Sequence, residues 1–107
     1  MKEILFVCLA AKNRSPTGAR IFNENFQKEG SDYHASCVGV ETNCNDDAIR
    51  NAYRVISVNW DVTKVLRDKF SDISERLREM EIPDCYPRDH EDLCNIFNEY
   101  YDSGQWQ

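Results

Sequence analysis

Apolar residues along the chain follow two patterns, short continuous runs and longer segments in which they recur at helical spacing. Short continuous runs are typical of strands covered on both faces, and a period of 3.6 residues is typical of helices with one buried face. The runs predict strands at residues 3–8, 33–38 and 54–58, and the end of a fourth strand at 80–82 before Pro83. The helical spacing predicts helices at 16–28, 46–52, 62–70 after an Asp61 cap, and 89–101.

The order of these segments predicts the fold class. Strands alternate with helices along the chain, which is typical of an α/β fold with a parallel sheet. We expect a four-stranded parallel sheet with helices on both faces and a phosphate-binding loop between its first strand and first helix. At 107 residues the chain suits one domain, residues 1–107, with 103–107 as a flexible tail. Residues 73–77 leave an alternative open, because they could instead prolong the third helix.

Composition and charge narrow the possible partners. No apolar run approaches the ~20 residues of a membrane span, and the first residues lack the pattern of a secretory signal. The net charge of −6 argues against nucleic acid as the main partner, because binding to a polyanion depends on a basic surface. The five cysteines form no C-x-x-C pair, which argues against a zinc site and a disulfide scaffold. We expect a cytoplasmic protein with reduced cysteines, no membrane association, and no metal or cofactor.

The segment from Cys8 to Pro16 connects the first expected strand to the first expected helix. Backbone N–H groups of such a short connection can converge on one anion, and the helix N-terminus favours negative charge there. Ser15 suits the N-cap of the helix, and Pro16 suits its first turn, where a missing N–H costs nothing. The connection is therefore a candidate phosphate-binding loop.

A thiol and a guanidinium lie at the two ends of this loop. Arg14 follows Cys8 by six positions, so its side chain can fold back over a bound anion and grip it with two parallel hydrogen bonds. The same positive surroundings favour the thiolate of Cys8, the form in which cysteine is a nucleophile. The alternative is that Cys8 is only a small core residue at the end of a buried strand.

Residues 4–8 and 14–22 resemble the low-molecular-weight protein tyrosine phosphatase family, and especially its compact branch of predicted phosphatases. The resemblance extends over about residues 3–101, with specific motifs at the two ends. It implies that Cys8 attacks a phosphoryl group and carries it as a cysteinyl-phosphate intermediate. It also implies that the phosphate is held by the loop residues Leu9, Ala10, Ala11, Lys12, Asn13, Arg14 and Ser15.

The segment from Ile82 to Tyr86 supplies a second candidate group, the carboxyl of Asp84. Strand ends in such sheets meet at the ligand-binding edge, and a carboxyl group there can protonate a leaving oxygen and later deprotonate a water. The family carries similar segments before its last helix, which implies the same role for Asp84 and a place for Tyr86 in the cleft wall, stacked on an aromatic substrate. The alternative for Asp84 is an ordinary turn carboxylate after proline.

The chain also departs from the family. Ala10-Ala11 stand where larger relatives have Gly-Asn, and Cys37 stands where relatives have a serine of the supporting network. Asn13 replaces a second cysteine that, in many relatives, protects the nucleophile through a disulfide. Cys85 directly follows the expected acid in the sequence, and we expect it to act as a redox partner that forms a reversible regulatory disulfide with Cys8.

Together these residues predict a metal-independent phosphomonoester hydrolase that acts on a phosphotyrosine protein or a small aryl phosphate. Two alternatives remain. The Ala10-Ala11 departure favours a catalytically weak or inactive module that binds phosphate or a phosphopeptide. A thioredoxin-coupled arsenate reductase would use a similar loop, but the cysteines at positions 37, 44, 85 and 94 do not show the spacing of its cysteine relay.

Overall fold

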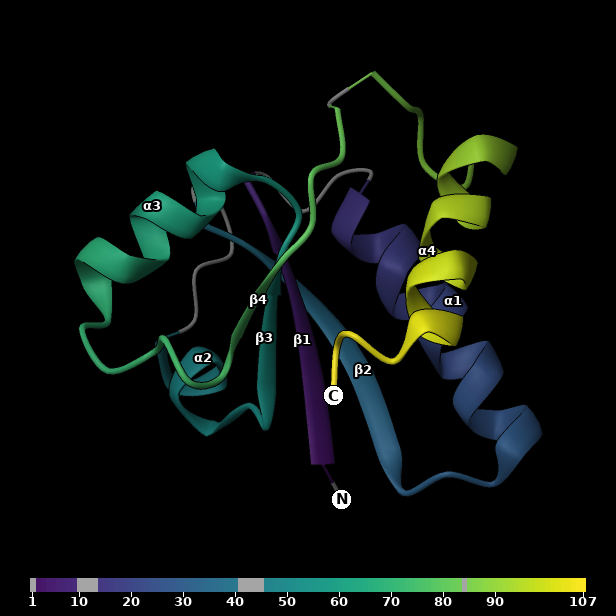
Figure 1. The fold of residues 1–107 in the computed structure, drawn as a ribbon, viewed down its shortest axis with the longest axis horizontal. Helices are drawn as coiled ribbons and strands as arrows, with labels where there is room; N and C mark the ends of the chain where they lie inside the picture. The colour runs from purple at the N-terminus through teal and green to yellow at the C-terminus, as the bar shows by residue number, and fades with distance from the viewer. Residues whose placement is uncertain (1, 10–13, 41–45, 84) are drawn as a thin grey trace.

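The computed structural model describes residues 2–9, 14–40, 46–83 and 85–107, and its strands form one sheet in the order β2-β1-β3-β4 (Figure 1). The strands are β1 Lys2–Cys8, β2 Tyr33–Gly39, β3 Arg54–Ser57 and β4 Leu77–Glu79. All neighbouring pairs are parallel, and β1 lies between β2 and β3. In a parallel sheet the carboxyl ends of the strands meet at one edge, so the connections that leave β1, β3 and β4 come together there.

Helices cover both faces of this sheet. They are α1 Arg14–Glu29, α2 Asp46–Asn51, α3 Trp60–Lys69 and α4 Glu91–Ser103. α1 and α4 pack together on one face, and α2 and α3 lie on the other (Figure 1). The predicted α/β class, a four-stranded parallel sheet with helices on both faces, is confirmed. α3 ends at Lys69, so the alternative in which residues 73–77 prolong it is wrong.

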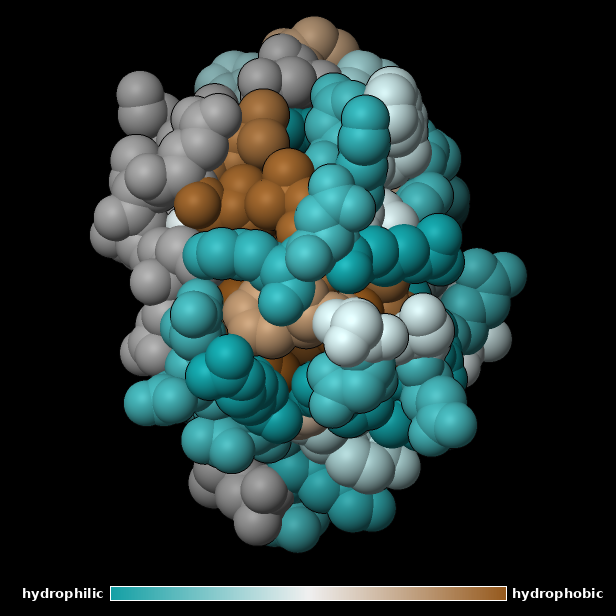
Figure 2. All heavy atoms as spheres, turned by 90° about the vertical axis from the view of Figure 1, so that its left-hand side faces the viewer, coloured by the Kyte–Doolittle hydropathy of each residue, from teal (hydrophilic) through white to brown (hydrophobic). Residues whose placement is uncertain are grey.

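Figure 2 shows the side of the molecule on which α2 and α3 lie, where hydrophilic side chains border a smaller apolar area. The surface is thus mostly polar over these two helices. Within the described ranges, no helix combines the length and the apolar character that a membrane crossing needs.

The fourth strand lies earlier in the chain than the sequence pattern predicts. β4 ends at Glu79, ahead of the predicted strand end at 80–82. Beyond it the chain still follows the exit of β3, because Met80 N–H donates to the carbonyl of Ser57 at 2.7 Å. The apolar residues at 80–82, which suggested a strand, therefore follow β4 and run alongside the exit of β3 without forming part of a strand.

Two helices begin close to, but not at, the positions that the sequence pattern predicts for their start. Asn59 caps α3 in place of Asp61, because the Asn59 side chain accepts from Val62 N–H at 3.2 Å. α4 starts after His90, which caps it, and Asp89 stays outside the helix. The N-cap is the residue whose side chain accepts a hydrogen bond from an unpaired backbone N–H of the first turn. Where several polar residues follow one another, the backbone geometry decides which of them becomes the cap.

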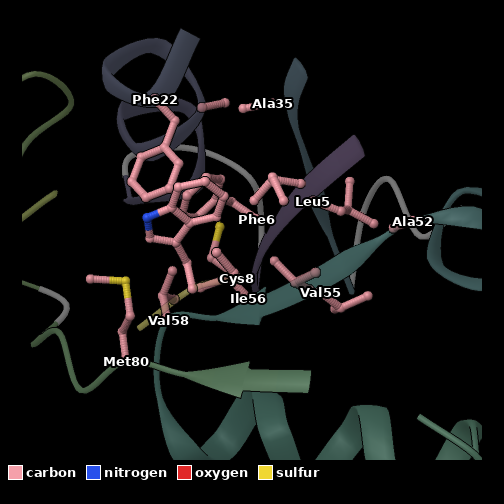
Figure 3. Packing of buried hydrophobic residues seen from close by; sticks show 14 of the residues in the cluster. Leu5, Phe6, Cys8, Phe22, Ala35, Ala52, Val55, Ile56, Val58 and Met80 are labelled. Atoms are coloured by element: carbon pink, nitrogen blue, oxygen red, sulfur yellow. The ribbon is translucent and has the colours of Figure 1, made fainter. Parts of the chain in front are cut away.

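The buried core is centred on β1. Every residue from Ile4 to Cys8 is at most 3% exposed, as expected for a strand covered on both faces. Phe6 packs edge-on against Phe22 of α1 and Phe97 of α4, with ring centroids 4.8 Å and 5.5 Å apart. Figure 3 shows Phe6, Phe22 and Cys8 within this packing. These rings join the two helices of one face to the central strand.

The last residues of the chain belong to this core, which corrects the expectation of a flexible tail at 103–107. Gly104 follows α4 in the left-handed conformation at φ 72° and turns the chain back. The Trp106 side chain is 2% exposed, and its Nε1–H donates to the carbonyl of Tyr101 at 3.0 Å. Its indole also contacts the Phe22 ring, at 5.4 Å between centroids. Burial of this large aromatic side chain holds the segment in place.

We expect Gly18→Ala to destabilise the protein, because Gly18 lies where α1 approaches both α4 and β1. A Cβ atom there would lie 2.7 Å from Cε1 of Phe97 and 3.0 Å from Cδ1 of Phe6. Overpacking of this kind lowers the free energy of unfolding by about 1–3 kcal/mol, measurable by urea denaturation. Gln27→Ala, on the exposed face of the same helix, should change it by less than about 0.5 kcal/mol. Equal unfolding midpoints for the two variants would contradict the close approach.

Candidate active site

The centre of the site is the junction between β1 and α1. Cys8 is the last residue of β1 and is 3% exposed, and α1 begins six positions later with Arg14. The Sγ atom of Cys8 lies 2.9 Å from Oγ of Ser15, which is fully buried. The predicted N-cap role of Ser15 is wrong: Ser15 lies inside the first turn of α1, and its hydroxyl contacts the thiol. Pro16 lies in that first turn, as predicted.

Arg14 connects this junction to the segment that leaves β4. Its side chain is buried, with 3% exposure, and Nη1 donates to the carbonyl of Ile82 at 2.9 Å. A guanidinium carries five N–H donors in a fixed plane, so this bond orients the group and uses one donor. The structure therefore buries a guanidinium on the residue before Ser15, whose hydroxyl contacts the thiol, and links it to the residue two positions before Asp84.

The far end of the same segment is held by the next turns of α1. Thr17 Oγ1 accepts from the backbone N–H of Asp89 at 2.9 Å and donates to its carboxylate at 3.3 Å. Arg20 Nε also donates to the Asp89 carboxylate, at 2.9 Å. Arg14, Thr17 and Arg20 are three residues apart, a spacing that puts them on one face of a helix. One face of α1 thus anchors both ends of residues 82–89.

The backbone of Asp89 has a conformation suited to this anchor. Its φ of 62° lies in the left-handed region, which asparagine and aspartate enter more readily than most residues. This conformation turns the chain into His90, the N-cap of α4. Figure 1 shows the resulting arch between β4 and α4 above the carboxyl ends of the strands. We refer to the described residues of this segment, 82, 83 and 85–89, as the arch.

The other predicted site residues are distributed over the loop and the arch. Leu9 is half-buried against the core. The predictions for Ala10–Asn13 and for Asp84 lie outside the described residues. Tyr86 is half-buried in the arch, with its ring 5.7 Å from that of His90, and Cys85 is exposed. The structure therefore brings Cys8, Arg14 and Ser15 together and anchors the segment that carries Tyr86.

A second described cysteine, Cys37, lies close to Cys8. Burial raises the pKa of the Cys37 thiol, the neighbouring Cys8 adds to the increase, and Arg88 and Ser15 oppose it. Cys37 thus belongs to the surroundings of Ser15 and Cys8, where the family resemblance expects a serine. The Cys8–Cys85 disulfide stays a prediction. Among the described residues, no group of three histidine, cysteine or carboxylate side chains could hold a metal ion.

Three residues of the anchor, Thr17, Arg20 and Asp89, were not among the residues predicted from the sequence. The spacing of Arg14, Thr17 and Arg20 on one helix face was a readable signal. The partner on the arch, Asp89, could not be identified from the sequence, because it lies 72 residues from Thr17 and the two residues meet only in the folded chain. Asp89 instead looked like part of the last helix.

No protein-family model and no curated protein matches the sequence. Solved structures, in contrast, share the fold over nearly the whole chain. A low-molecular-weight protein tyrosine phosphatase from T. tengcongensis has 16% identity and a TM-score of 0.78, and the match covers 96% of this chain and 99% of that one. The YwlE arginine phosphatase from Geobacillus stearothermophilus has 13% identity and a TM-score of 0.72, with 96% and 87% coverage.

A third match is a cysteine-to-serine mutant of the YwlE arginine phosphatase with a phosphorylated active-site serine. It has 12% identity and a TM-score of 0.75, and the match covers 97% of this chain and 91% of that one. At these identities the likeness shows a common fold. The resemblance to low-molecular-weight phosphatases seen in the sequence is thus confirmed at the level of the fold.

We expect Thr17→Val to loosen the arch, because valine keeps the shape of threonine but removes both hydrogen bonds to Asp89. The free energy of unfolding should fall by about 1–3 kcal/mol. Trypsin should cut after Arg88, an exposed arch residue, about 5–30-fold faster, because cleavage follows the population of the opened segment. Thr17→Ser keeps the hydroxyl and should cut at nearly the parent rate. Equal cleavage of the valine and serine variants would show that these bonds do not hold the arch.

Proposed function

We propose that this protein is a phosphomonoester hydrolase that acts on phosphotyrosine in proteins or on small aryl phosphates through a cysteinyl-phosphate on Cys8. The observation that carries the proposal is the 2.9 Å contact between Cys8 Sγ and Ser15 Oγ, next to the buried Arg14 and at the carboxyl edge of the sheet. A buried thiol with a hydroxyl partner and a neighbouring guanidinium is suited to act as an anionic nucleophile on a phosphoryl group. The solved structures with this fold are phosphatases, which supports the same reaction class.

In the first step, Sγ of Cys8 attacks phosphorus, the S–P bond forms, and the bond from phosphorus to the phenolic oxygen breaks. Asp84 gives its proton to that oxygen as it leaves. Ser15 donates a hydrogen bond to the thiolate, while Arg14 and the loop N–H groups of residues 9–15 hold the three remaining oxygens. These donors stabilise the charge that spreads over the transferring group.

In the second step, a water attacks phosphorus and gives its proton to the Asp84 carboxylate. The S–P bond breaks, phosphate leaves, and Cys8 returns to the thiolate that began the cycle. The YwlE mutant with a phosphorylated active-site serine shows that a side chain in the active site of that relative can carry the phosphoryl group. That observation supports a covalent intermediate on the corresponding thiol here.

The anchored arch gives the two chemical groups a common support. α1 begins at the loop that follows the nucleophile, and its Arg14, Thr17 and Arg20 side chains hold the segment that contains Asp84. A general acid must stay within hydrogen-bonding distance of the leaving oxygen, and a displacement of about 1 Å can cost about 100-fold in rate. Tyr86 lies on the same segment, where its ring can stack on an aromatic substrate.

The loop and Arg14 supply positive charge for phosphoryl transfer, so the proposed reaction needs no metal or cofactor. A phosphate site of this kind is compatible with a net charge of −6, because the cations and N–H groups act locally. We also propose that the protein is located in the cytoplasm and that its thiols are reduced there.

We expect Cys8→Ser to abolish release of p-nitrophenol from p-nitrophenyl phosphate, because the serine hydroxyl is a much weaker nucleophile. Binding of inorganic phosphate, measured by isothermal titration calorimetry, should persist because Arg14 and the loop remain. Cys94→Ser, on α4, is the matched control and should keep the parent rate. A Cys8→Ser variant with parent activity would rule out the assignment. Phosphopeptide binding by the parent protein without any phosphate release would favour the binding-module alternative, and arsenate-dependent oxidation of thioredoxin would favour the reductase.

We expect Asp84→Asn to remove one limb of the pH dependence of kcat. The parent rate should fall as the pH rises and the carboxyl group loses the proton that the leaving oxygen needs. Asparagine cannot supply that proton, so kcat should drop by about 100–10,000-fold and lose this dependence. A bell-shaped profile that survives in Asp84→Asn would assign the proton to another group.

Measuring phosphate release from phosphotyrosine and phosphoarginine peptides in the same assay distinguishes the two phosphatase activities named for the structural neighbours.

A further inference from the structure

An exposed tryptophan lies at the carboxyl edge of the sheet. Trp60, the first residue of α3, is 58% exposed, and among the described residues only Val65 is also a large exposed hydrophobic side chain. A hollow of about 300 Å³ opens beside the indole. It is lined by Asn59, Trp60, Asp61, Glu81, Ile82 and Pro83.

This hollow adjoins the candidate active site. One wall comes from the connection between β3 and α3, and the other comes from the chain that leaves β4. Ile82, in the second wall, is the residue whose carbonyl accepts the hydrogen bond from Arg14. Figure 1 shows the start of α3 and the beginning of the arch at the same end of the sheet. A substrate held at Cys8 would therefore place its flanking residues near Trp60.

The hollow is acidic. Among the described residues, its lining contains the carboxylates of Asp61 and Glu81 and no cationic side chain. Glu79 lies two positions before Glu81, on the same side of the extended chain, and borders the Trp60 indole from an adjacent hollow. Desolvation and the neighbouring carboxylates of Glu79 and Asp61 raise the pKa of Glu81. Negative charge is thus concentrated around one exposed indole.

Two of the described cations line the adjacent hollow that shares Trp60 with this one, and the Arg14 guanidinium donates to the carbonyl of Ile82 in the wall of this one. Lys64 and Arg67, one and two turns further along α3, line the adjacent hollow together with Glu79. Among the described residues, Asp61, Glu79 and Glu81 form no ion pair. A cation that entered the hollow between Trp60 and Glu81 would therefore meet carboxylates that no described cation already neutralises.

The chemistry of this surface selects one kind of occupant. The face of an indole attracts a guanidinium or ammonium group, and a carboxylate at its edge adds a charge-assisted hydrogen bond. An anionic or purely apolar group would instead be placed beside two carboxylates. The charge complementarity therefore favours a cationic side chain on an extended peptide.

We infer that the hollow between Trp60 and Glu81 binds an arginine or lysine side chain of the protein substrate, close in sequence to the phosphorylated residue. The inference rests on the proposed function and specifies its substrate class, a phosphoprotein with a basic residue beside the phosphorylation site. The subsite raises specificity by adding binding energy outside the reacting group. Asp61 supports the same cation from the start of α3.

The test compares phosphotyrosine peptides that differ at one position within three residues of the phosphotyrosine. Each peptide carries either arginine or citrulline there, because citrulline has nearly the same shape without the charge. We expect kcat/KM of the parent protein to be about tenfold higher for the best arginine peptide, the effect of one cation–π contact with a charged partner. The ratio should fall to about twofold or less in Trp60→Leu and in Glu81→Gln.

Matched control variants distinguish the loss of a local subsite from an effect of net charge and from a loss of folding. Asp72→Asn removes the same charge from the turn before β4, at the opposite edge of the sheet, and Val65→Ala shortens the other exposed side chain of α3. Both should keep the parent preference. p-Nitrophenyl phosphate has no flanking residues, so its turnover should stay within about twofold in all four variants, which also shows that they fold.

Each outcome decides the question. Normal turnover of p-nitrophenyl phosphate with equal rates for arginine and citrulline peptides would overturn the subsite and leave the proposed function standing. A preference that survives in both Trp60→Leu and Glu81→Gln would also overturn it. A parent protein that hydrolyses none of these substrates would instead overturn the proposed function, and the subsite with it.

Discussion

The attachment of the arch to one face of α1 is the constraint on which the candidate site depends. Arg14 holds Ile82 at one end of the arch, and Thr17 and Arg20 hold Asp89 at the other. The same helix begins at the loop that follows Cys8. A single rigid element therefore sets the distance between Cys8 and the segment proposed to carry the acid. In a site that depends on positions within about 0.5 Å, this shared support matters more than any one contact.

The packing below the site explains why α1 can serve as this support. Phe22 and Phe97 meet on Phe6 of the buried central strand, and Gly18 leaves room for α4 to approach. The buried Trp106 closes the far end of the same aromatic cluster. α1 is thereby held by the sheet, by α4 and by the end of the chain. The polar face of α1 at the sheet edge does not take part in this aromatic packing, and its side chains form the hydrogen bonds to the arch.

The edge of the sheet also explains how one site could combine opposite charges. The Arg14 side chain is buried, while the carboxylates of Asp61 and Glu81 line an open hollow beside the exposed Trp60. Parallel strands bring these groups to one edge, and their different exposure keeps their effects local. A phosphoryl group and a basic side chain of one substrate would then each meet surroundings of opposite charge.

The sequence by itself determined the elements that depend on local pattern. The continuous apolar run of β1, the helical spacing of α1 and the short Cys8–Arg14 connection predicted the fold class and the junction of thiol and guanidinium, because burial and backbone geometry act there over a few residues. Only the tertiary structure decided which polar residue caps α3 and α4, and that Trp106 joins the core. It also decided that Thr17 meets Asp89. The caps depend on the backbone geometry that the fold imposes on neighbouring residues. The contacts of Trp106 with Phe22 and of Thr17 with Asp89 join residues far apart in the chain, which meet only after the sheet and its helices have assembled.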